Sequence, residues 1–190
     1  MSYAYTTEIA EAAMAVPEFV ERFVDVKKFL GYCRNCPNYE VRWACPPYDF
    51  DPVEVWKKYR EVKILGVKII FDDSLAGKKV GKDEFQKIYR EVLRAESDKL
   101  YAALKAEEDA TPGSFLLYPG SCHLCGDKEC DRRKHPCRHR QDLRYSIEAL
   151  GGDVTAVTTE MLGFTLEWVG GEGVMPRYLS QVGGLLVSSF

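Results

Sequence analysis

The chain has 190 residues, with 26 lysines and arginines against 29 aspartates and glutamates, so its formal charge is −3. Hydrophobic residues make up 46% of it, enough for a core, and this composition excludes a disordered chain. The weak negative charge argues against a nucleic-acid partner, and no apolar run reaches the roughly 20 residues of a membrane span. The start lacks the cationic region of a signal peptide. We therefore expect a single domain over residues 1–190, in the cytoplasm, with no membrane partner.

The first half of the chain predicts three helical regions and one strand. Residues 1–31 begin Ala-rich and amphipathic, which predicts a helix that passes into a strand or loop. Asp51, followed by a proline, is typical of a helix start, so we expect a short helix over 52–61. Residues 62–71 are apolar in both alternating sets, which predicts a strand covered on both faces inside a sheet. Apolar residues at helical spacing predict a long helix over 82–108.

The second half predicts shorter elements. These are a strand over 114–118, a helix over 139–150 that ends at two glycines, strands over 154–158 and 164–169, a short helix from Pro176, and a last strand over 185–190. Such alternation of strands and helices is typical of right-handed crossovers. We therefore expect an α/β (or α+β) fold with a mixed, largely parallel sheet and flanking helices. The loop after 114–118 would then lie at the carboxyl end of a strand and enter a helix, where open α/β sheets bind ligands.

Seven cysteines form two sets, separated by 76 residues that contain none. The first set has the spacing Cys-x2-Cys-x8-Cys and the second Cys-x2-Cys-x4-Cys-x6-Cys. Cytoplasmic thiols stay reduced and the number is odd, so we expect no disulfide framework. Cysteines two residues apart can bind one metal, and bunched thiols complete its shell, so the spacing predicts metal sites. The candidate ligands are Cys33, Cys36 and Cys45 in segment 33–45, and Cys122, Cys125, Cys130 and Cys137 in segment 122–137, which we call the tetrad.

Four thiolates suit either zinc or an iron–sulfur cluster. The cysteines at 36, 45 and 137 adjoin a proline, as ligands do in bacterial ferredoxins, whereas zinc ribbons more often show two Cys-x2-Cys pairs. We therefore favour a 4Fe–4S cluster at the tetrad, with zinc as the alternative. The first set offers three thiolates. It either recruits a fourth ligand, leaves a metal position open to a substrate, or only braces a loop.

Histidines and basic residues surround the tetrad. His123, His135 and His139 could each replace a thiolate, but we favour a role outside the ligand shell because four cysteines suffice. Residues 131–144 carry six arginines and lysines against two aspartates. Cations among the ligands would favour reduction of an anionic cluster and could dock an acidic redox partner or an anionic substrate. The alternative interpretation is a solvated face.

Two stretches, GYCRNCPNYEVRWACPPYDFDPVEV and PGSCHLCGDKECDRRKHPCRHRQDLRYSIEALGGDV, together resemble a known family. It comprises the predicted metal-binding proteins of domain-of-unknown-function family 2284, found in anaerobic bacteria and archaea. Its pattern joins Cys-x2-Cys, Cys-Pro-Pro-Tyr and a cysteine cluster ending in Pro-Cys-Arg, then Arg-x-Ser-x-Glu-Ala and Gly-x-Asp-Val. The resemblance covers about residues 24–158. It implies metal binding by the same seven cysteines, favours a 4Fe–4S centre, and supplies no reaction.

Three functional hypotheses follow. The first is an iron–sulfur electron-transfer protein with one or two 4Fe–4S clusters and a redox partner protein. The second is a zinc-stabilised binding module without redox activity. The third is an enzyme that uses an open iron at the three-cysteine site on a small-molecule substrate. Whether the chain is an enzyme, and whether it forms a homo-oligomer, stay open at this point.

Overall fold

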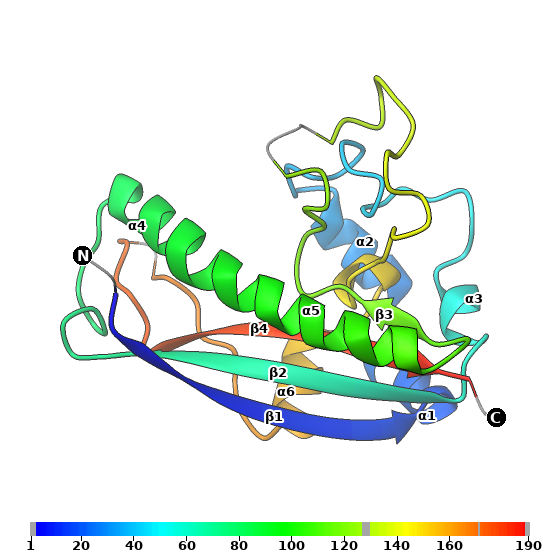
Figure 1. The fold of residues 1–190 in the computed structure, drawn as a ribbon, viewed down its shortest axis with the longest axis horizontal. Helices are drawn as coiled ribbons and strands as arrows, with labels where there is room; N and C mark the ends of the chain where they lie inside the picture. Colours follow the sequence, from blue (N-terminus) through cyan, green and yellow to red (C-terminus); the bar gives the residue numbers. More distant parts are fainter. Residues whose placement is uncertain (1–2, 127–129, 171, 189–190) are drawn as a thin grey trace.

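The computed structural model of the chain describes residues 3–126, 130–170 and 172–188. Its centre is one sheet of four strands in the order β1-β2-β4-β3 (Figure 1). The strands are β1 (Tyr5–Ala15), β2 (Glu61–Phe71), β3 (Phe115–Leu117) and β4 (Tyr178–Val187). Every neighbouring pair runs antiparallel, with Ile64 of β2 opposite both Ala12 of β1 and Gly184 of β4.

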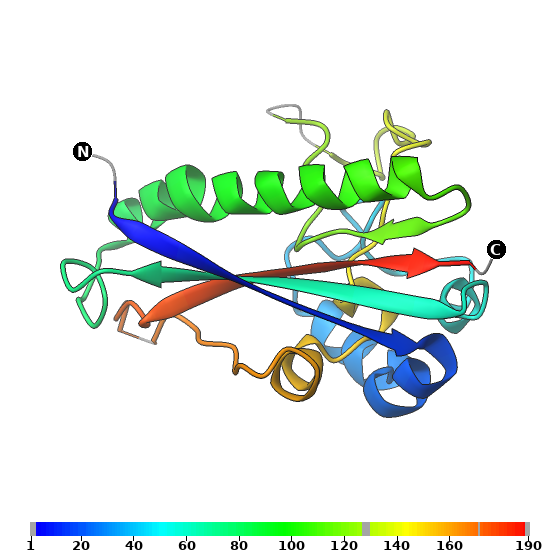
Figure 2. The ribbon, with the colours of Figure 1, turned by 60° about the horizontal axis from the view of Figure 1, so that its bottom comes forward.

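Helices cover both faces of this sheet. They are α1 (Val16–Phe23), α2 (Val26–Cys33), α3 (Val53–Trp56), α4 (Lys82–Ile88), the π-helical turn η1 (Tyr89–Leu93), α5 (Arg94–Ala110), the 3-10 turn η2 (Glu148–Leu150) and α6 (Val154–Glu160). Figure 2 shows α4, η1 and α5 as one continuous helix on one side of the sheet, with α1 and α6 on the other. In the described part of the chain, no helix has both the length and the apolarity needed to cross a bilayer.

The alternation along β2 divides the core in two. Val62 and Ile64 pack on the side of α1, α3 and α6, whereas Val67 and Ile69 pack under the long helix. All four side chains are buried. Because β2 lies between β1 and β4 and is covered on both faces, the prediction of an interior strand over 62–71 is confirmed.

The prediction of a largely parallel sheet is wrong. It depended on strands over 154–158 and 164–169, but the first segment forms α6 and residues 164–169, all described, form no strand. Asp153 explains α6: its carboxylate accepts a hydrogen bond of 3.0 Å from the N–H of Ala156, which caps the helix and outweighs the β-branched residues after it. Without those strands there is no repeated crossover, and antiparallel neighbours fill the sheet instead.

Other elements were also mispredicted. Residues 5–15 form edge strand β1 rather than a helix, because Ala10, Ala12 and Met14 pack on the core where the strand pairs with β2. Residues 139–150 form only η2 near their end, so the tetrad loop enters no long helix, and β3, which precedes it, is an edge strand. Pro176 begins no helix. Of the strand predicted over 185–190, residues 185–187 belong to β4, and 189–190 lie outside the described residues.

The long helix over 82–108 and the strand over 114–118 are confirmed in position by α4 to α5 and by β3. Of the short helix predicted over 52–61 only α3 forms, and Glu61 already begins β2. The carboxylate of Asp51 accepts a hydrogen bond of 2.9 Å from the N–H of Val53, although the N-cap is Pro52 rather than Asp51. Of these elements, α3 follows the first cysteine segment, and α5 and β3 carry the chain into the second.

Candidate metal centre

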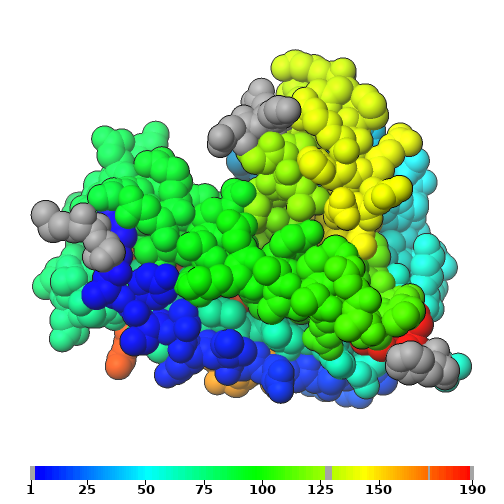
Figure 3. All heavy atoms as spheres, in the orientation of Figure 1, coloured from blue at the N-terminus to red at the C-terminus, as the bar shows by residue number. Residues whose placement is uncertain are grey.

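The two cysteine segments, 76 residues apart in sequence, lie against each other at one end of the molecule. In Figure 3, the yellow-green and yellow segment that follows β3 projects as a lobe beyond the long green helix, and the cyan segment with the first cysteines lies beside it. Hydrogen bonds join the two. Arg42 donates to the carbonyl oxygen of Cys122 at 2.7 Å, Asn38 to the hydroxyl of Ser121 at 3.0 Å, and the Trp43 indole to the carbonyl oxygen of His135 at 2.9 Å.

Arg132, from the segment that carries the tetrad, adds further hydrogen bonds to the first cysteine segment. Its guanidinium donates to the carbonyl oxygen of Cys45 at 3.1 Å and to that of Pro47 at 2.9 Å. Its backbone N–H donates to the carbonyl oxygen of Val41 at 2.8 Å. A charged donor that holds two carbonyls fixes their relative position. The Cys-Pro-Pro loop is therefore held in place by a residue from the other cysteine segment.

Local structure presents the first three cysteines. The carboxylate of Asp25 caps α2 by accepting from the N–H of Lys28 at 2.9 Å, and Cys33 is the last residue of that helix. A turn follows, closed by the Cys36 N–H on the carbonyl oxygen of Cys33 at 2.9 Å. A second turn, from Arg42, ends at Cys45. The Cys-x2-Cys spacing thus becomes a helix end and a turn, which brings both thiols to one side of the loop.

The four tetrad cysteines line one small cavity, together with Arg42, Trp43, Leu124, His139 and others. The space left for the centre of a water-sized sphere is about 10 Å³, roughly one water molecule. The structure thus brings all four predicted ligands to one cavity. Among the described residues, however, no three histidine, cysteine, aspartate or glutamate side chains are placed to hold a metal ion directly, so the thiols must shift to bind one. Their donor chemistry, four sulfur atoms, fits zinc or an iron–sulfur cluster.

Cys33, Cys36 and Cys45 line a second cavity of about 200 Å³. Cys122 of the tetrad and the carboxyl of Glu148 line it as well. Cys122 is therefore common to both cysteine cavities. This proximity of the two sets was not evident from their spacing in the sequence.

The thiols affect one another electrostatically. Burial, reinforced by the neighbouring Cys36, Cys33 and Cys122, raises the pKa of Cys45 to about 12. Burial also raises the pKa of Cys122, and Cys130, Cys125 and Cys137 act in the same direction. Because a thiolate disfavours a second negative charge nearby, buried sulfurs such as these stay protonated until a cation compensates them. Each set is thus a group of interacting sulfurs.

Glu148 is a site residue that the sequence analysis missed. Burial raises the pKa of its carboxyl group. Burial, then the neighbouring Cys36 and then this carboxyl raise the pKa of the Cys33 thiol. Glu148 belongs to the Arg-x-Ser-x-Glu-Ala segment of the family pattern, which was the available signal. No chemistry was assigned to that segment because a single glutamate in a predicted helix has no distinctive spacing.

The basic residues near the tetrad have partly structural roles. Besides Arg132, Arg144 binds Glu108, at 2.6 Å from its Nε to Oε1. Asp131 pairs with Arg133 and Lys134, and the hydrogen bonds from Arg133 lower the pKa of its carboxyl well below the usual range. The interpretation of the run as only a solvated face is therefore incomplete.

The three histidines separate by position. His123 is hydrogen-bonded to the carboxylate of Asp98 and to the carbonyl oxygen of Ser121. His135 is hydrogen-bonded to the guanidinium of Arg138 and to the carbonyl oxygen of Pro136. His139 lines the tetrad cavity. Of the three, His139 is thus the one placed beside the four cysteines.

Comparison with known families gives a match over residues 21–187, which contain both cysteine sets and Glu148. The matching family is described as predicted metal-binding proteins, domain-of-unknown-function family 2284. The chain belongs to this family. The resemblance is confirmed, and metal binding is the property that membership supports; the description names no metal and no reaction. No curated protein and no solved structure matches the chain.

Proposed function

We propose that this family member is an iron–sulfur protein in which Cys122, Cys125, Cys130 and Cys137 hold a 4Fe–4S cluster. The observation that carries the proposal is that these four cysteines, and no other cysteine, line one cavity. Four thiolates are the usual ligands of such a cluster. When bound, the cluster supplies one-electron transfer.

A second centre is proposed at Cys33, Cys36 and Cys45. Its support is the position of Cys122, which faces both cavities. Cysteine runs that contribute ligands across two centres occur in two-cluster ferredoxins. Structural zinc sites, in contrast, are closed units with four ligands of their own. Two adjoining thiol sites are better suited to electron transfer between clusters than to two independent structural zinc sites.

An acidic redox partner is proposed for the basic lobe. The side chains of Arg133 and Lys134 are exposed although they pair with Asp131, and Arg138 and Arg140 are exposed nearby. A cationic surface next to a cluster attracts an acidic protein and speeds its association at low ionic strength. Association that slows as salt is raised would support this docking face.

Zinc is the second candidate, and the size of the tetrad cavity favours it. The free space of about 10 Å³ is closer to the size of one ion, whereas a cubane needs the cysteine loops to move further apart. In that case the metal would only stabilise the folded loops, and the lobe would act as a binding module.

Metal and sulfide analysis of protein purified under strict anaerobiosis separates the two. We expect brown protein with about four iron and four sulfide per chain for one cluster, or about eight of each for two. Cys125→Ala should remove the iron and sulfide of the tetrad, and Cys45→Ala those of the first set. Ser74→Ala is the control: Ser74 is exposed and lines neither cysteine cavity, so its replacement should keep both. A colourless protein with stoichiometric zinc and no sulfide would reject the iron–sulfur proposal.

A further inference from the structure

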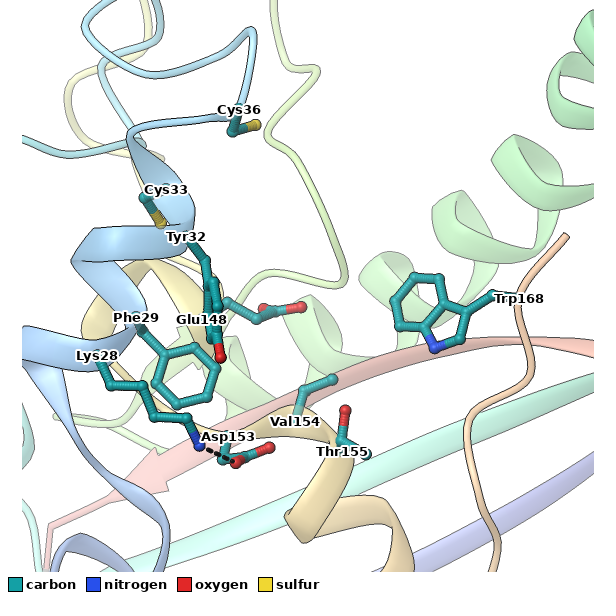
Figure 4. Close-up of a pocket in the computed structure, with 10 residues that line it drawn as sticks. All are labelled: Lys28, Phe29, Tyr32, Cys33, Cys36, Glu148, Asp153, Val154, Thr155 and Trp168. Atoms are coloured by element: carbon teal, nitrogen blue, oxygen red, sulfur yellow. Dashed lines mark hydrogen bonds and ion pairs between the residues drawn. The ribbon is translucent and has the colours of Figure 1, made fainter. Parts of the chain in front are cut away.

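A pocket of about 520 Å³ opens beside the first cysteine set. Figure 4 shows Phe29 and Tyr32 of α2 on one side and Trp168 across the open space, with the start of α6 below. Cys33 and Cys36 lie at one end. The volume falls within the range of about 300–1,000 Å³ that is typical of small-molecule sites.

Two of the most exposed large hydrophobic side chains in the described chain flank this pocket. Trp168 is 72% exposed and Tyr32 62%. The other two tryptophans are placed differently: Trp56 is fully buried and donates to the carbonyl oxygen of Leu150, and Trp43 donates to His135. Aromatic surface left in water is stabilised when a ring covers it. Exposed aromatics on opposite sides of one cavity are therefore suited to a flat ligand.

The polar groups of the pocket limit the charge of that ligand. Lys28 lies near Asp153, with 3.3 Å between its Nζ and a carboxylate oxygen, so these two charges compensate each other. Glu148 also lines the pocket, and across the described ranges no lysine or arginine pairs with it. A carboxyl accepts hydrogen bonds when ionised and donates one when protonated. The one lysine of the lining is thus already paired, which leaves no cation there for an anionic ligand, and the aromatic faces favour a cation or a neutral ring.

The pocket reaches the metal centre. Cys33, Cys36 and Glu148 line both this pocket and the cavity of the first cysteine set. A molecule between the aromatic side chains would thus have one end beside those sulfurs. This is the set with only three cysteines of its own.

We propose that this pocket binds a small, planar, neutral or cationic molecule, whose ring lies between Tyr32 and Trp168 and whose polar end meets Glu148 next to Cys33 and Cys36. The site goes beyond the proposed metal function and does not depend on which metal is bound. Its ligand class is a one-ring aromatic or nitrogen heterocycle, not a carboxylate.

Calorimetric titration of the protein as isolated tests this inference, with benzamide and N-methylpyridinium as probes and benzoate as the anionic counterpart. We expect benzamide or N-methylpyridinium to bind with Kd near or below 1 mM, a usual value for such small probes, and benzoate at least about tenfold more weakly. Trp168→Ala and Tyr32→Ala should each weaken binding about tenfold. Ile9→Ala is the matched control, because Ile9 is 71% exposed on β1 and does not line the pocket.

The inference is overturned if neither probe binds, if benzoate binds as well as they do, or if Ile9→Ala weakens binding as much as Trp168→Ala. Both aromatic residues are exposed, so their replacement leaves the core intact and does not confuse binding with folding. Metal content is measured on the same samples. A preparation without iron that still binds benzamide would contradict the iron–sulfur proposal alone, and an iron–sulfur protein that binds neither probe would contradict this site alone.

Discussion

Glu108 on α5 connects the two ends of the tetrad segment. Its Oε1 accepts the N–H of Leu116, on β3 before the tetrad, at 2.7 Å. Both carboxylate oxygens also accept from Arg144, after the tetrad, at 2.6 and 2.9 Å. The side chains of Glu108 and Arg144 are 6% and 15% exposed. We predict that Glu108→Leu strongly destabilises the fold and weakens metal retention.

The magnitude follows from the groups left behind. Removing one partner of a buried ion pair costs about 3–5 kcal/mol, because the other charge stays buried without compensation. In Glu108→Leu, Arg144 is left in that state and Leu116 loses the acceptor of its N–H. In the double variant Glu108→Leu/Arg144→Met both charges of the buried pair are gone, and Lys105, which also pairs with Glu108, keeps Asp109 as its partner. The main cost left is the unpaired N–H of Leu116, at about 1–3 kcal/mol. The double variant should therefore be more stable than the single one.

Urea denaturation at neutral pH, with and without a chelator, measures these differences. Glu107→Gln is the matched control. Glu107 is next to Glu108 in the chain and pairs with Lys63 at 2.7 Å, but its side chain is 35% exposed. Such a surface pair contributes about 0–1 kcal/mol. The reasoning is refuted if Glu108→Leu is no more destabilising than Glu107→Gln, or if adding Arg144→Met makes the single variant worse. Metal loss from Glu108→Leu alone would show that the connection supports the tetrad.

Further predictions address the metal, the joint between the cysteine segments, the sheet and acid. Cys125→Ala should lose the tetrad metal and unfold at a lower temperature, because metal binding and folding are coupled; an unchanged melting curve of the loaded protein would contradict this. Arg132→Ala removes two hydrogen bonds to the first cysteine loop and should cost about 1.5–3 kcal/mol and speed metal release to a chelator. Gly184→Ala should cost about 1–3 kcal/mol in denaturant, since its Cβ would lie 2.5 Å from a carbonyl oxygen of β2, whereas Gly31→Ala meets nothing within 4 Å. Burial raises the pKa of Glu108, but its hydrogen bonds outweigh this and the net shift is downward, so its stabilisation is complete above the unfolded pKa of about 4.3 and is lost as the pH falls through the folded pKa. Glu108→Gln should flatten the acid side of the stability curve.

Long local signals in the sequence predicted their elements correctly. Residues 62–71 carry apolar side chains on both faces, and residues 82–108 carry apolar side chains at helical spacing. In both segments the local sequence alone therefore indicates the element and its burial. Residues 5–15 do not: alanine favours a helix in isolation, and only pairing with β2 over eleven residues makes the strand more stable. The segment 154–158 shows the reverse case, because one capping aspartate decides it.

The cysteines of the candidate site could be picked out because their spacing is itself the signal. The spacing cannot predict that the two sets lie side by side in space. Their proximity depends on contacts such as Arg42 with Cys122 and Arg132 with Cys45, across some 80 residues of chain. Glu148 was missed for the same reason. Its importance lies in the three cavities that it lines, and these exist only after folding.

The position of Cys122 between both cysteine cavities has a consequence for assembly and damage. If both proposed centres form, the one loaded first fixes the position of this sulfur, and the second must form around it. Oxidation of that one atom would then disable both centres at once. Maturation and oxygen injury would then be all-or-none events for the pair rather than separate events at each centre.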